Sequence, residues 1–229
     1  MKLFGNIGRN FGKIFLALAV AGCLAGSSAE VWGRDTALGN HGRINHTQYH
    51  KGEKASCSIA ELPVTLEEFK ELQAQIATEP QGAVVCFLAA MNVYVHDEEE
   101  GTECLKLASY KIGGSEISTL KQKLRGSDDD PYVQKYLPYA HFRGADAKNG
   151  YTPDEPLTLE VSVNNGLPYR ELSDEESPVI YLNFKTQGTD IGQRSVSVIK
   201  PYDSDYFVVF ERAGLYMQVK NPPRSQRRK

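Results

Sequence analysis

The residues of this chain that are best suited to chemistry fall in one short segment. His141, Arg143, Asp146 and Tyr151 lie between residues 139 and 156, a stretch rich in Gly and Pro. An imidazole, a guanidinium, a carboxylate and a phenol at this spacing leave two interpretations open. They line a polar pocket, in which His141 would move protons for a hydrolase-like enzyme, or they hydrogen-bond an irregular but ordered loop.

The usual signatures that would complete an enzyme do not accompany this segment. The sequence has no G-x-S-x-G motif, no phosphate- or dinucleotide-binding glycine pattern and no C-x-x-C pair. His41, His46 and His50 lie in a glycine-rich region where nothing rigid is predicted to bring them together. We therefore expect no metal, no cofactor and no assigned catalytic residue.

The cysteines of the domain are Cys57, Cys86 and Cys104. In a hairpin made by the second and third predicted helices, Cys86 and Cys104 would lie about 12 Å apart along the axis, which is too far for a bridge. Cys57 precedes the first predicted helix. The start of that helix should lie beside the end of the second helix and hence near Cys104. If the chain is exported and a disulfide forms, we predict Cys57–Cys104, with Cys86 a buried free thiol.

Residues 1–29 have the pattern of an export signal. Basic residues without any acid precede an apolar run from Ile14 to Leu24, which is too short to span a membrane and is followed by small residues. Two processing routes fit. Ser27-Ser28-Ala29 suits cleavage before Glu30, and Val20-Ala21-Gly22-Cys23 resembles the bacterial lipobox, in which Cys23 carries the lipid. Residues 30–57 are expected to be a flexible tether, which favours lipidation.

Charge argues against a nucleic-acid partner. The formal net charge is −3, and the basic leader residues make the remainder more acidic still, so the domain repels phosphate backbones. The one cluster of basic residues is the tail over residues 222–229, which is expected to be a solvated terminus, with contact to an anionic surface as the alternative. We expect the partner to be an envelope protein or a small ligand, and the membrane to be reached only through an N-terminal lipid.

Residues 58–221 are predicted to form one α+β domain. The apolar run Pro80–Val95 has no polar face, so it is expected to be the central helix of the core. Helices are predicted over residues 65–76, 80–95, 102–112 and 115–124, with an acidic turn at 97–101 and a short helix from Ser127. Alternation with period two predicts strands over residues 157–163, 179–186, 194–200, 206–211 and 215–219. A helical N-terminal half should therefore pack on a C-terminal antiparallel sheet of four to five strands.

Three segments of this domain resemble an uncharacterised family of exported bacterial proteins, a domain of unknown function. They are Leu62–Met91, with its apolar helix; Pro138–Val161, whose distinctive part contains Phe142, Gly144-Ala145, Asn149-Gly150-Tyr151 and Pro153; and Arg194–Pro222. The resemblance spans about Ile59–Pro222 and departs at Phe207, where Trp is usual. It implies the domain boundaries and brings no site residues with it.

These observations predict an extracytoplasmic, lipid-tethered and non-catalytic domain that binds a partner or a small ligand in the cell envelope. The alternatives are a periplasmic hydrolase-like enzyme with a polar site near His141, and a structural envelope protein without a pocket. A deep polar cleft around His141 and Asp146 would favour the enzyme.

Overall fold

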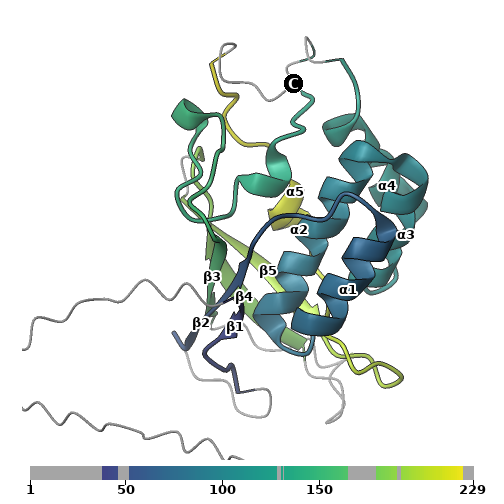
Figure 1. Cartoon of the computed structure of the whole chain (residues 1–229), viewed down its shortest axis with the longest axis vertical. Coiled ribbons are helices and arrows are strands. Elements are labelled where there is room, and N and C mark those ends of the chain that lie inside the picture. The colour runs from purple at the N-terminus through teal and green to yellow at the C-terminus, as the bar shows by residue number, and fades with distance from the viewer. Residues whose placement is uncertain are drawn as a thin grey trace, which may run out of the picture. The chain divides into compact units, whose positions relative to one another are not determined.

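The computed structural model shows a layer of helices packed against one curled sheet (Figure 1). It describes residues 38–45, 52–127, 130, 132–164, 179–189 and 192–223. The expected signal peptide with Cys23, the first part of the expected tether and the tail from Arg224 onward lie outside the described residues.

Among the described residues, the domain has six strands and five α-helices. The strands are β1 (Gly39–His41), β2 (Lys54–Ile59), β3 (Leu157–Val163), β4 (Val179–Lys185), β5 (Gln193–Ile199) and β6 (Val208–Val209). The helices are α1 (Leu66–Ile76), α2 (Pro80–His96), α3 (Glu98–Ala108), α4 (Gly114–Leu124) and the short α5 (Ala213–Tyr216), with 3-10 turns η1 (Leu137–Tyr139) and η2 (Ala147–Asn149).

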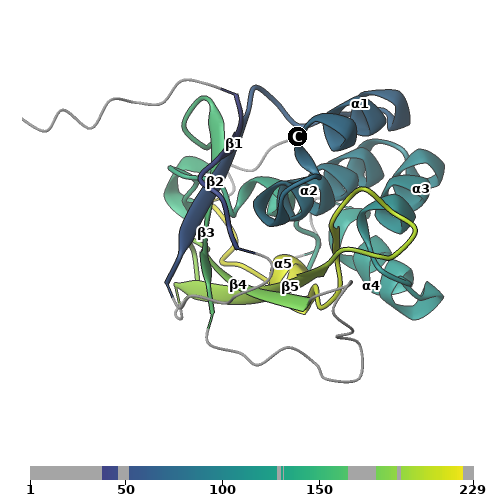
Figure 2. The ribbon, with the colours of Figure 1, turned by 90° about the horizontal axis from the view of Figure 1, so that it is seen from below.

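The strands follow one another in chain order across the sheet, β1-β2-β3-β4-β5-β6, and each neighbouring pair is antiparallel. Figure 2 shows that the sheet bends so that its concave face surrounds α2. Alternate residues supply that face. Cys57 lies opposite Leu159, and Val161 opposite Phe184, and all four are buried.

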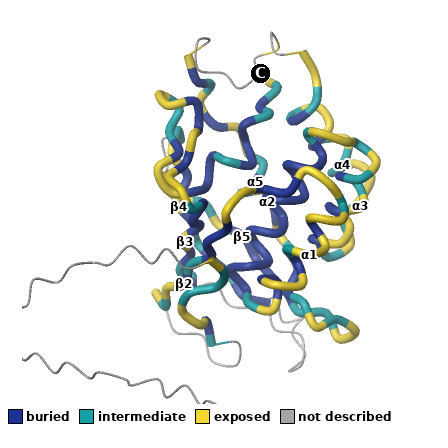
Figure 3. The backbone as a smooth tube through the Cα atoms, in the orientation of Figure 1, coloured by how far each residue is buried: buried dark blue, intermediate teal, exposed yellow. Residues whose placement is uncertain are grey.

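The central helix is α2, as its lack of a polar face predicted. Every residue from Pro80 to Tyr94 is buried, and the helix forms the dark core in Figure 3. Its two buried amides reach backbone oxygens, because Gln81 Nε2 donates to Gly42 O at 3.3 Å and Asn92 Nδ2 to Pro63 O at 2.9 Å. Within the described residues, no helix combines the length and the apolarity that crossing a bilayer requires.

The prediction of four to five strands was wrong, and the helical half is not purely helical. The sheet has six strands, and β1 and β2 precede the helices. β1 and the first part of β2 lie in the range expected to be a tether, so that expectation is corrected for residues 39–41 and 54–57. Ala55, Cys57 and Ile59 alternate inward along β2, but the glycines and charges around this short pattern gave residues 30–57 the composition of a linker.

The acidic turn expected at residues 97–101 is instead the beginning of α3. Asp97 ends α2 and caps α3 directly, accepting hydrogen bonds from the Glu99 and Glu100 amides at 2.9 and 2.8 Å. Glutamates in the first turn of a helix are favoured by its macrodipole. The cluster of acids is therefore the start of a helix. Residues 132–136, which were expected to be helical, form turns instead.

Candidate functional site

His141 is buried and both of its ring nitrogens are occupied. Its Nε2 lies 2.8 Å from Leu215 O and its Nδ1 2.9 Å from Thr186 Oγ1. Burial lowers the pKa of His141 to about 3, so the ring is neutral at physiological pH and carries one proton. Because a carbonyl oxygen only accepts, that proton is on Nε2, and Nδ1 accepts from the Thr186 hydroxyl. This imidazole has neither a lone pair nor a proton to offer a substrate.

The other three residues of the expected pocket point in different directions. Tyr151 is buried, stacks on Tyr136 with ring centroids 4.9 Å apart, and donates its hydroxyl to Lys220 O at 2.7 Å. Asp146 caps η2 by accepting from the Lys148 amide at 2.7 Å. Arg143 is half-exposed and lies 3.9 Å from both Asp154 and Glu160.

His141 and Tyr151 instead hold the C-terminal segment, residues 212–221, against the domain. Arg194 joins them, since its guanidinium donates to the carbonyls of Gly214 at 3.3 Å, Met217 at 2.8 Å and Gln218 at 2.8 Å. Gln134 makes a two-way pair with Val219, donating to its oxygen at 2.6 Å and accepting from its amide at 2.9 Å. We call this set of contacts the C-terminal clamp. The segment over residues 139–156 was interpreted either as a polar pocket or as an ordered loop, and the contacts of His141 and Tyr151 fit the ordered loop.

The pocket expected near His141 reduces to a small hollow. It has a volume of about 200 Å³ and is lined by His141 and Arg143, together with Phe142, Gly144, Thr158, Glu160, Lys185 and Gln187. Asp146 and Tyr151 do not line it. The structure thus brings two of the four predicted residues to one hollow, and one of those two, His141, has its polar atoms engaged elsewhere.

The three cysteines of the domain are buried free thiols, so the expected bridge between Cys57 and Cys104 is absent from the structure. Cys57 lies within strand β2 and not in a loop ahead of α1. The pKa of Cys86 is raised mainly by burial and to a smaller extent by the nearby Cys57. Burial raises the pKa of both Cys57 and Cys104 to about 12. These thiols are protonated packing groups, as expected for Cys86 alone.

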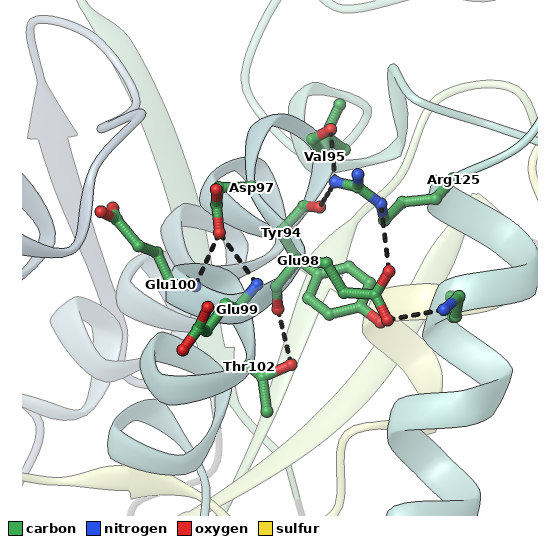
Figure 4. A network of polar contacts seen from close by, with 9 residues as sticks. Tyr94, Val95, Asp97, Glu98, Glu99, Glu100, Thr102 and Arg125 are labelled. Carbon is green, nitrogen blue, oxygen red and sulfur yellow. Dashed lines mark hydrogen bonds and ion pairs between the residues drawn. The ribbon is translucent and has the colours of Figure 1, made fainter.

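The acidic residues at the start of α3 are likewise used within the fold (Figure 4). Glu98 lies 2.6 Å from Lys121 Nζ and 3.7 Å from Arg125 Nε, and Arg125 also donates to Tyr94 O at 2.8 Å and Val95 O at 3.1 Å. This network ties the end of α2 and the start of α3 to α4. The described residues contain no group of three or more metal-ligating side chains placed to hold an ion.

A larger cavity lies between the start of β1 and α1. This open groove has a volume of about 650 Å³, which is within the usual range for ligand sites. It is lined by Leu38 and Gly39 at β1, by Ser58–Val64 at the end of β2 and in the loop that follows, and by Glu68, Glu71, Leu72, Gln75 and Ile76 on α1.

Helical spacing accounts for the α1 wall of the groove. Glu71 and Leu72 lie three and four residues after Glu68, and Gln75 lies four and three residues after them, so these side chains share one face of the helix. The adjacent face carries Phe69 and Gln73 into the core. The capping box sets where α1 begins, because Thr65 accepts from the Glu68 amide and Glu68 accepts from the amides of Val64 and Thr65.

The groove combines an apolar floor with an acidic rim. Ile59, Leu62 and Ile76 are buried beneath it. Among the residues that line the groove, Glu61, Glu68 and Glu71 are charged, and none is basic. Glu61 and Glu71 are exposed, and no ion pair within the described chain neutralises them. Leu38 and Val64, at the mouth, are 60% and 42% exposed.

Sequence reasoning did not find this groove. Leu72 lies three residues after Phe69 and four before Ile76, which is the spacing of the buried stripe of α1, whereas it is only half-buried and lines the groove. The available signal was the mixed face of α1, on which Leu72 lies between acidic and amide side chains. The β1 wall gave no signal, because the sequence did not show that Leu38 and Gly39 return to the sheet.

Comparison with known proteins identifies the family. Residues 61–223 match the model of a domain of unknown function, DUF6935, and the chain therefore belongs to that family. The match agrees closely with the range over which the sequence resembles such a domain. No curated protein and no solved structure matches the chain.

Proposed function

We propose that this chain is an exported, lipid-tethered protein of the cell envelope, whose domain binds a partner or ligand in the groove between β1 and α1 without catalysing a reaction. The observation that carries the proposal is the groove itself: about 650 Å³ of open space with an apolar floor and unneutralised acids at its rim. Exposed apolar and charged groups that face an open cavity are available to a ligand.

The region around His141 supports the non-catalytic part of the proposal. A general base must reach the proton that it abstracts, and both ring nitrogens of His141 are already engaged at 2.8–2.9 Å. The hydrolase-like alternative gains no support from this geometry, and the groove disfavours a purely structural protein without a pocket.

A ligand screen by thermal shift tests the groove. A ligand that binds only the native state raises the melting temperature. Ala60 is exposed and lines the groove, so Ala60→Trp should fill it, whereas Ala74→Trp places the same ring on the exposed surface of α1 outside the groove. Ligands should stabilise the wild type and Ala74→Trp but not Ala60→Trp. Equal stabilisation of all three would place the site elsewhere.

The export and lipid parts of the proposal need a separate test, because they rest on the leader sequence. Cells expressing the chain are fed an alkyne-tagged fatty acid, and the mature N-terminus is identified by mass spectrometry. A lipidated N-terminal Cys23 is expected, with the label lost in Cys23→Ala. An unlabelled chain that starts at Glu30 would establish cleavage after Ala29, and a chain that retains Met1 in the cytoplasm would refute export.

A further inference from the structure

We infer that the groove takes an extended segment of another envelope polypeptide, one that carries basic and apolar side chains and pairs with the outer edge of β1 beside Gly39. This inference rests on the proposed function and names the chemistry of the partner. Three independent features of the groove support it: its charge, its floor and the strand edge beside it.

The charge of the rim selects a basic partner. Glu61 and Glu71 are exposed at the groove and unpaired within the described chain, and Glu68 adds a third carboxylate. The pKa of Glu68 is lowered, mainly because its carboxylate accepts a hydrogen bond from the Val64 amide at the start of α1. This carboxylate therefore stays ionised. Like charges would repel an acidic segment, whereas lysine or arginine side chains would complement the rim.

The floor selects apolar side chains. Ile59, Leu62 and Ile76 are buried under the groove, and Leu38 and Val64 remain exposed at its mouth. Covering Leu38 and Val64 removes apolar surface from water, which contributes about 25 cal/mol per Å². A partner that carried only charged side chains would leave this apolar surface in contact with water.

The strand edge selects an extended backbone. β1 is the first strand of the sheet, and among the described strands it pairs with β2 alone, with Gly39 opposite Ser58. In an antiparallel pair, alternate residues direct their N–H and C=O groups away from the partner strand. No strand of the described chain lies beyond β1, and Leu38 and Gly39 both line the groove. A segment added to such an edge gains main-chain hydrogen bonds while its alternate side chains enter the groove.

An unbiased peptide selection tests the inference. The full chain, with Cys23→Ser to prevent lipidation, is immobilised and presented with a random library of peptides of roughly ten residues. We expect the enriched peptides to carry lysine or arginine at alternate positions with apolar residues between them. Their affinities are then measured by fluorescence anisotropy.

Matched variants of the protein separate local charge from total charge. The double variant Glu61→Gln, Glu71→Gln should bind the selected peptides about tenfold more weakly, and its effect should shrink at high salt. Glu99→Gln with Glu103→Gln removes the same charge from exposed positions on α3 and should leave the affinity unchanged. Methylating alternate backbone nitrogens of the peptide should abolish binding in one register only, since only one set faces β1.

The outcomes distinguish this inference from the proposed function. Selected peptides without basic residues, or peptides that bind both double variants equally, would overturn the basic partner even if they compete with ligands for the groove. Binding that tolerates methylation in both registers would overturn strand addition. If no peptide is enriched while small ligands still stabilise the protein in the Ala60→Trp experiment, the groove remains a ligand site and the polypeptide partner is refuted.

Discussion

The C-terminal clamp and the groove beside α1 are both rich in polar side chains, but they use them in opposite ways. In the clamp, His141, Tyr151 and Arg194 direct their polar atoms at backbone carbonyls of residues 214–220. Along the groove, Glu61 and Glu71 face solvent without an ion pair in the described chain. The polar side chains of the clamp therefore form hydrogen bonds within the fold, whereas the carboxylates of the groove are available to a binding partner.

This difference shows why residue type alone was a poor guide to the site. Histidine, arginine and tyrosine in an irregular loop are equally suited to catalysis and to satisfying buried carbonyls, because a buried backbone oxygen needs a donor wherever no helix or strand supplies one. What separates the two roles is whether the donor already has a partner. The predictions below test that separation by comparing stability with binding.

The largest loss of stability is expected for His141→Ala. The substitution leaves the Leu215 carbonyl and the Thr186 hydroxyl without partners and opens a cavity against Phe184, whose ring centroid lies 5.2 Å from that of His141. The expected cost is about 3–5 kcal/mol, measured by urea denaturation at neutral pH. A change below about 1 kcal/mol would mean that the clamp does not depend on this residue.

A smaller loss is expected for Arg194→Gln. Three carbonyls of the C-terminal segment lose a charged donor, but Arg194 is only half-buried and water can replace part of the interaction. We expect a cost of about 2 kcal/mol and faster amide hydrogen exchange in residues 213–221. Unchanged exchange there would show that the guanidinium does not hold the segment.

Acid should weaken the clamp through His141. Its folded pKa of about 3 lies below the value of 6.5 in the unfolded chain, so between these values the unfolded state binds the extra proton. Stability is then fully present above pH 6.5 and is lost as the pH falls, by up to about 1.4 kcal/mol per pH unit. His141→Gln should flatten the stability curve between pH 6.5 and 4.5, as followed by denaturation at each pH. An unchanged slope would contradict the assignment.

Below pH 4.5 a second group should contribute. Burial would raise the pKa of Glu116, but the hydrogen bonds and charge of Arg212 lower it overall. Its stabilising effect is present above the unfolded pKa and is lost as the pH falls through the folded one. Glu116→Gln should therefore reduce the remaining acid sensitivity, in the same denaturation series, without altering the slope above pH 4.5.

The smallest effect on stability is expected at the groove. Glu61→Gln and Glu71→Gln remove exposed carboxylates without an ion pair in the described chain, so the free energy of unfolding should change by less than about 0.5 kcal/mol. The same double variant should lose binding of the selected peptides. A large destabilisation would place these residues with the clamp and remove the distinction between the two regions.

The helices could be predicted from the sequence because their signals are local. A capping box at Thr65 and Glu68 marks the start of α1 at Leu66, close to the predicted start at residue 65. Pro80 lies in the first turn of α2, and the run without a polar face is the buried centre of the domain. Three central strands, β3 to β5, followed from alternation with period two.

The ends of the domain could not be predicted in the same way, because their structure depends on distant partners. Residues 215–219 alternate like a strand, but the contacts of Arg194, Gln134 and His141 hold this segment, and α5 occupies its first part. β1 has three residues and is a strand only because β2 lies beside it. The groove depends on that pairing, so it could not be predicted before the sheet was known.

Position-specific photo-crosslinking in intact cells tests the central claim most directly. Gln75, in the groove, and Gln187, in the hollow beside His141, are both exposed glutamines, and each is replaced in turn by a photoreactive phenylalanine. The account predicts a discrete covalent adduct from position 75, lost when Glu61→Gln and Glu71→Gln are added, and none from position 187. An adduct from position 187 alone would contradict it and return the binding site to the segment around His141.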